Sequence, residues 1–146
     1  MEKSPFEEFE ELRIDNTSKL FLTETARWAT FLAILGYIGI GLMVLVAIFV
    51  LIIGSSVSMG PFSGGTLISL FYFALAAFYY LPINFLYRFS SNMKEALRTN
   101  NQANLTKSFE YLKSHYKFIG ILTIVLFGLY ILLIIGTIIT GFGSYL

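Results

Sequence analysis

One long stretch of this chain, residues 28–87, contains no Asp, Glu, Lys, Arg or His, although charged residues crowd both of its ends. It is interrupted only at residues 54–66, where Gly, Ser, Pro and Thr replace Leu, Ile and Phe. We therefore expect two membrane-spanning helices, at 28–53 and 67–87, joined by a short turn. A second uncharged stretch, 118–140, is long enough for a third span. The sequence predicts an all-α integral membrane protein with three transmembrane helices.

The composition agrees with a membrane protein of one domain. Of the 146 residues 56% are hydrophobic, above the roughly half of soluble domains. The start is acidic and the first apolar block is too long for a signal peptide, so we expect the first span to be retained. We expect an acidic N-terminal tail and interfacial segment at 1–22, and a single membrane domain at 23–146. Thr23 is a plausible N-cap for the first span.

Between the second and third spans lies a polar segment, 88–117, whose apolar residues recur at helical spacing in two groups. They are Phe89, Met93, Ala96 and Leu97, followed by Leu105, Phe109, Leu112 and Tyr116. We predict an amphipathic helical pair, with Asn100 ending the first helix and Asn104 capping the second. The second helix is expected to continue into the third span. The pair can lie on the inner leaflet or pack as a hairpin over the ends of the spans.

The distribution of Lys and Arg predicts the topology. The 88–117 segment carries six and the N-terminal segment four, whereas the turn at 54–66 and the tail at 141–146 carry none. By the positive-inside rule we expect a cytoplasmic N-terminus, a cytoplasmic helical pair and a C-terminus on the opposite side.

Two features inside the spans concern helix packing. Small residues fall near one face of the first span, and we predict that Ala29, Ala33, Gly36 and Ala47 pack against the second span, the third span or a copy of the first. Pro82 is expected to kink the second span. Asn84, beside it, then needs a hydrogen-bond partner, either the carbonyl that Pro82 frees or a neighbouring helix.

Residues that carry chemistry are scarce. No ionisable group lies within the spans, which disfavours an ion-coupled machine. The chain has no cysteine, and the single His115 stands without the further ligands that a metal needs. We expect no catalytic, cofactor-binding or metal-binding residues, no cofactor and no nucleic-acid partner. The cations that we expect to contact phospholipid headgroups or a partner are Lys94, Arg98, Lys107, Lys113 and Lys117.

Several short segments resemble a family of small Bacteroidota inner-membrane proteins known only as a domain of unknown function. The resemblance rests on residues 23–28, 31–36, 88–91, 96–98, 105–109, 112–113 and 116–122. It implies a bacterial inner-membrane location, with the C-terminus then in the periplasm. The family has no activity to transfer.

From these features we expect a non-enzymatic accessory or scaffold subunit of a larger inner-membrane complex. Its mechanism would be docking, in the bilayer through apolar faces and outside it through charged ones. Two alternatives are a self-associating pore or small-solute permeation unit, and a lipid-binding, membrane-shaping protein. The first of these requires a homo-oligomer.

Overall fold

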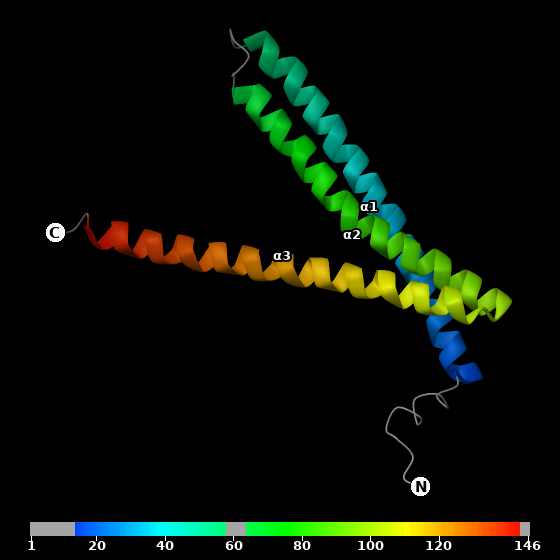
Figure 1. The fold of residues 1–146 in the computed structure, drawn as a ribbon. Helices are drawn as coiled ribbons and strands as arrows, with labels where there is room; N and C mark the ends of the chain where they lie inside the picture. Colours follow the sequence, from blue (N-terminus) through cyan, green and yellow to red (C-terminus); the bar gives the residue numbers. More distant parts are fainter. Residues whose placement is uncertain (1–13, 58–63, 144–146) are drawn as a thin grey trace.

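The computed structural model describes residues 14–57 and 64–143, and these form three helices (Figure 1). They are α1 (Asn16–Val57), α2 (Gly64–Thr99) and α3 (Gln102–Gly143). No strand occurs in the described ranges. The predicted all-helical architecture with three long apolar helices is confirmed.

Each helix is long and apolar enough to cross a membrane. The chain is therefore built as a multi-pass membrane protein. The helices of 42, 36 and 42 residues exceed what a membrane requires. At 1.5 Å per residue they run about 54 to 63 Å, whereas a hydrocarbon core is about 30 Å thick. Each helix therefore extends beyond its apolar segment.

The start of α1 differs from the prediction. The helix begins at Asn16, and the backbone N–H of Ser18 donates a 2.8 Å hydrogen bond to the Asp15 carboxylate. Hydrogen bonds from Ser18 lower the pKa of Asp15 below its ordinary value, as expected of an N-cap carboxylate. Thr23 is not the cap, because it lies inside the helix and its hydroxyl donates to the Lys19 carbonyl.

The polar turn between α2 and α3 is shorter than predicted. Asn100 ends α2 in the left-handed conformation, with a φ of 51°, as expected for a residue that terminates a helix. The cap of α3 is Asn101 and not Asn104, because the Asn101 side-chain oxygen accepts from the N–H groups of Ala103 (2.9 Å) and Asn104 (3.3 Å).

No helix boundary separates the second span from the predicted amphipathic pair. Residues 88–99 belong to α2, and residues 102–117 belong to α3, which continues without a break as expected. No Gly or Pro lies at the junction near Arg88, so hydrogen bonding within the helix propagates through it. The residues of the predicted pair are therefore helical, as the adjoining ends of two long helices.

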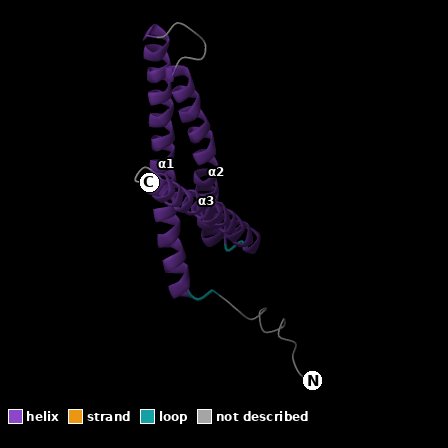
Figure 2. Ribbon diagram, turned by 90° about the vertical axis from the view of Figure 1, so that its left-hand side faces the viewer, coloured by secondary structure: helices purple, strands orange, loops and turns teal. Residues whose placement is uncertain are grey.

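The three helices are arranged as a hairpin with an arm. α1 and α2 lie side by side in both ribbon views (Figures 1 and 2), whereas α3 packs on α2 near the turn and then diverges. No Cα atom of α1 comes within 8 Å of one in α3. Side chains of all three helices nevertheless meet in one core near the turn. Its buried members are Ala26, Ala29, Phe89, Met93, Ala96 and Leu105.

Glycines allow the close approach of α1 and α2. A Cβ on Gly54 would lie 2.6 Å from the Cα of Gly65, and a Cβ on Gly36 would lie 2.8 Å from the side chain of Ile83. Real side chains do not approach so closely. The backbones of Gly54 and Gly65 are in contact, and the Ile83 side chain packs directly on Gly36, because these glycines have no side chain.

Candidate functional site

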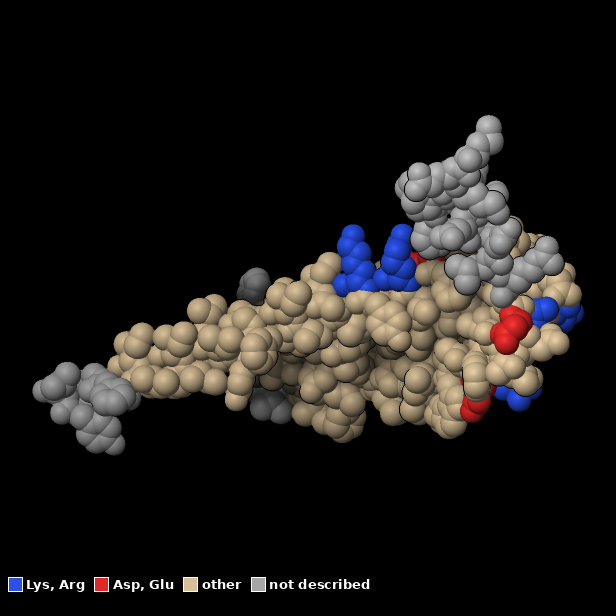
Figure 3. Space-filling model, turned by 90° about the horizontal axis from the view of Figure 1, so that it is seen from below, with Lys and Arg blue, Asp and Glu red and all other residues tan. Residues whose placement is uncertain are grey.

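The charged residues gather at one end of the molecule. Every described Asp, Glu, Lys and Arg lies in residues 15–27 or 88–117. Figure 3 shows these side chains around the end that holds the core, while the arm formed by the rest of α3 is uncharged. This end is also the place where the three helices meet, so we take it as the candidate site.

Polar contacts across helices hold this end together. His115 Nδ1 of α3 lies 2.8 Å from the Pro82 carbonyl of α2, and Nδ1 must be the donor because a carbonyl only accepts. Lys94 of α2 donates to the Thr30 hydroxyl of α1. These two hydrogen bonds join α2 to α3 and to α1 close to the boundary between the charged and the apolar parts of the helices.

Arg88 makes two hydrogen bonds and a cation–π contact near the same boundary. Its Nη1 donates to the Tyr111 hydroxyl of α3 at 3.1 Å, and its Nε donates to the Asn84 side-chain oxygen at 3.4 Å. The guanidinium also lies 5.6 Å from the centre of the Tyr111 ring, which adds a cation–π interaction. Two neutral acceptors and a ring therefore fix the side chain without a carboxylate.

An aromatic cluster lies nearby on the α1–α2 interface. The ring of Tyr37 packs against Tyr80 and Tyr87, at centroid distances of 6.0 and 6.1 Å. The cluster carries hydroxyls but no acid, so it leaves the charge of Arg88 unbalanced.

The predicted packing residues of α1 all lie against α2 or in the core. Ala29, Ala33 and Ala47 are buried, and Gly36 faces Ile83. Of the three partners considered for this face, the structure places α2 there.

The predicted kink residues have partners that differ from the expected ones. α2 continues through Pro82, whose carbonyl accepts from His115. Asn84 bonds to Arg88 in its own helix, and neither the freed carbonyl nor a neighbouring helix is its partner. The expectation failed because an arginine one turn further along the same face is within reach.

The predicted contact cations fall into two groups. Lys94 bonds to Thr30, and Arg98 forms an ion pair of 2.7 Å with Glu95. Lys107, Lys113 and Lys117 are exposed along α3. Only Arg98 has its charge balanced by a carboxylate, because the partner of Lys94 is a neutral hydroxyl; Lys94, Lys107, Lys113 and Lys117 keep their full charge.

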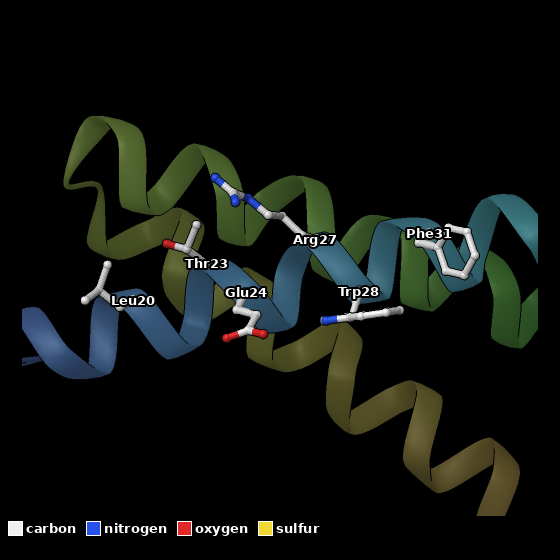
Figure 4. Close-up of a pocket in the computed structure, with 6 residues that line it drawn as sticks. All are labelled: Leu20, Thr23, Glu24, Arg27, Trp28 and Phe31. Atoms are coloured by element: carbon white, nitrogen blue, oxygen red, sulfur yellow. The ribbon is translucent and has the colours of Figure 1, made fainter.

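Of the surface grooves that the described residues line, we take three as parts of the site. One, of about 680 Å³, is lined by one face of α1 (Figure 4), whose residues are Leu20, Thr23, Glu24, Arg27, Trp28 and Phe31. This face mixes charge with aromatic rings, as interfacial helix faces do. A second, of about 370 Å³, lies between the three helices beside Trp28, Phe89 and Tyr116.

The third groove, of about 310 Å³, lies where α3 begins to leave α2 and is lined only by apolar side chains. They are Phe78, Phe118, Ile121, Leu122 and Val125. The ring centroids of Phe78 and Phe118, which both line the groove, lie 4.9 Å apart. In a bilayer such a groove accommodates hydrocarbon.

Beyond this groove α3 has no partner in the described chain, and every residue from 123 to 140 is exposed. The Thr123, Thr137 and Thr140 hydroxyls bond to carbonyls of their own helix. Tyr130 is 60% exposed, and none of the described residues bonds to its hydroxyl. Near the middle of an apolar segment such a hydroxyl is costly.

The sequence reading missed the contacts of Arg88 and His115. A signal for Arg88 existed, because it is the first charge after the long uncharged stretch. For His115 no such signal exists, because nothing in its neighbourhood along the chain points to Pro82. Among the described residues, no three His, Cys, Asp or Glu are grouped as metal ligands would be.

Comparisons of this chain with protein-family models, with curated proteins and with solved structures found no match. The family resemblance drawn from short segments therefore stays a prediction.

Proposed function

We propose that this protein is a non-enzymatic accessory or scaffold subunit of a larger inner-membrane complex, and that the arm of α3 is its docking element. The observation that supports this most is Tyr130. An exposed phenol near the middle of an apolar helix leaves a polar group unsatisfied in lipid, at a cost of roughly 1–3 kcal/mol. A neighbouring helix that accepts its hydrogen bond removes this cost.

The position of Tyr130 also defines a face. Thr123, Tyr130 and Thr137 are spaced by seven residues, so they lie along one stripe of α3. The threonine hydroxyls donate within their own helix but retain lone pairs that accept from a partner. The partner helix is therefore expected to carry small or hydroxyl-bearing residues opposite this stripe.

The α1–α2 hairpin is suited to holding α3 in a position where a partner can bind it. The small-residue face of α1, formed by Ala29, Ala33, Gly36 and Ala47, is used against α2 and in the core, so the hairpin carries α3 as a projecting arm. The excess of Lys and Arg near the turn favours a cytoplasmic location for the N-terminus and for the α2–α3 turn. The C-terminus then lies in the periplasm.

Self-association is the competing function. A second copy of α3 can satisfy Tyr130 equally well, and several copies could enclose a path lined by the Thr123, Tyr130 and Thr137 hydroxyls. The small-solute pore considered from the sequence would be built in this way.

Site-specific photocrosslinking in intact membranes separates these functions. A photoreactive residue in place of Leu126, next to the Tyr130 stripe, is expected to capture a different protein in a stoichiometric adduct. The Tyr130→Phe background is expected to lower its yield about fivefold, because one hydrogen bond is worth about 1 kcal/mol.

The matched control places the photoreactive residue at Leu132, which is equally apolar and lies on another face of the same arm. It is expected to give no protein adduct. An adduct with a second copy of this chain alone would favour the self-associating pore, and conductance of the reconstituted protein would then decide. Equal adducts from both positions would contradict a docking face at Tyr130.

A further inference from the structure

We propose that Arg88 and the apolar groove between α2 and α3 form a binding site for an anionic phospholipid. Its phosphate binds the Arg88 guanidinium, and one acyl chain occupies the groove. This inference is independent of the function proposed above, because it concerns the protein without any partner.

The charge of Arg88 favours an anion. A guanidinium has five N–H donors, and the bonds to Tyr111 and Asn84 use one on Nη1 and one on Nε. Both Nη2 hydrogens remain, on a side chain that is exposed. A phosphate can take them in the paired geometry that arginine prefers.

No carboxylate in the described chain balances this charge. Glu95, two turns further along the same face of α2, is the nearest acid on that face, and it is paired with Arg98. Because the ring of Tyr111 and the Asn84 amide are neutral, the site carries a net positive charge. A headgroup with net negative charge is therefore favoured over a zwitterionic one.

The groove lies further along α3 from this site, in the apolar part of the molecule. Tyr111, Phe118 and Val125 are spaced by seven residues, so they form one stripe of α3, descending about 10 Å with each step. Tyr111 contacts Arg88, while Phe118 and Val125 line the groove. A ligand with an anionic head and an apolar chain matches a cationic side chain followed by an apolar groove.

The depth of the site points to a lipid as the occupant. Arg88 is the first charge after the uncharged stretch, and the groove lies within the apolar segments of α2 and α3. The helices diverge there, so hydrocarbon must occupy the space between them in a bilayer. The Tyr130 stripe occupies a different face of α3, and a bound lipid leaves it free.

Native mass spectrometry of the full chain, released from detergent with equal amounts of phosphatidylglycerol and phosphatidylcholine, tests the site. The wild-type protein is expected to retain phosphatidylglycerol preferentially. Arg88→Gln is expected to lower this preference about tenfold, since a charge-assisted hydrogen bond is lost. Tyr111→Phe keeps the charge of Arg88 but removes the hydroxyl that positions its guanidinium. This variant is expected to lower the preference for phosphatidylglycerol about twofold to threefold.

Matched controls separate the site from general attraction to positive charge. Arg98→Gln removes an arginine that Glu95 already neutralises, and it is expected to retain the wild-type preference. Val125→Trp fills the groove and is expected to reduce retention of both lipids, whereas Ile131→Trp, outside the groove, is not. Equal preferences in Arg88→Gln and Arg98→Gln, or a wild-type protein that does not discriminate, would overturn the proposal. Circular dichroism confirms that each variant is folded.

Discussion

Gly54 and Gly65 face each other where α1 and α2 approach, and an added Cβ on either would meet backbone atoms of the other. Backbone cannot move aside as a side chain can. At Gly36 the opposing atoms belong to the flexible side chain of Ile83. Gly39, in the same helix, has no atom within 4 Å of an added Cβ. Helix packing thus depends on which glycine is substituted.

We expect the glycine-to-alanine series to be graded accordingly. Gly54→Ala should destabilise the α1–α2 hairpin by about 1–3 kcal/mol through overpacking, and Gly36→Ala by less. Gly39→Ala should be neutral or slightly stabilising, because alanine is the better helix former. Unfolding in mixed micelles, followed by circular dichroism, measures the order. A Gly39→Ala protein as unstable as Gly54→Ala would contradict this account of the interface.

At the scale of elements, α3 meets α1 only in the core near the turn and otherwise packs on α2, and the His115–Pro82 hydrogen bond joins α3 to α2 near the point where the two helices diverge. His115→Phe keeps a ring but removes the donor, and we expect a loss of about 1 kcal/mol. The angle between α2 and α3 should then vary more widely.

Spin labels on cysteines at Tyr79 and Ile124 measure this angle, since the chain has no cysteine of its own and both positions are exposed. The distance distribution should broaden in His115→Phe. Ser114→Ala, which removes a hydroxyl bonded within its own helix, is the control and should leave the distribution unchanged. An unaltered distribution in His115→Phe would show that this bond does not hold α3.

The three helices were predictable from the sequence, because a long run of apolar residues without charge is favoured in lipid and spans it as a helix. Their ends were not, because an α-helix continues wherever its hydrogen bonds can, irrespective of where the bilayer ends. Asp15 and Thr23 are both good N-caps, and local sequence does not decide between them.

The site was likewise predictable only in part. The small-residue face of α1 could be identified from its spacing, and the structure places it against α2. The Arg88–Tyr111 and His115–Pro82 contacts join residues of different helices. They depend on the register between α2 and α3, which is set by the turn at Asn100 and Asn101 and not by any periodicity.

At the scale of the whole molecule, the charged halves of the helices gather at one end and the apolar halves extend from it. In the topology that we propose, three crossings place the N-terminal start of α1 and the α2–α3 turn on one side of the membrane. The end of α1, the start of α2 and the end of α3 then lie on the other. Every proposal above depends on this arrangement.

Single cysteines introduced into the cysteine-free chain test it most directly. With a membrane-impermeant thiol reagent, Ser18→Cys and Asn100→Cys should react from the cytoplasmic face. Gly64→Cys should react only from the opposite face, and Ile131→Cys from neither. Labelling of Asn100→Cys and Gly64→Cys from the same face would contradict the three-crossing arrangement.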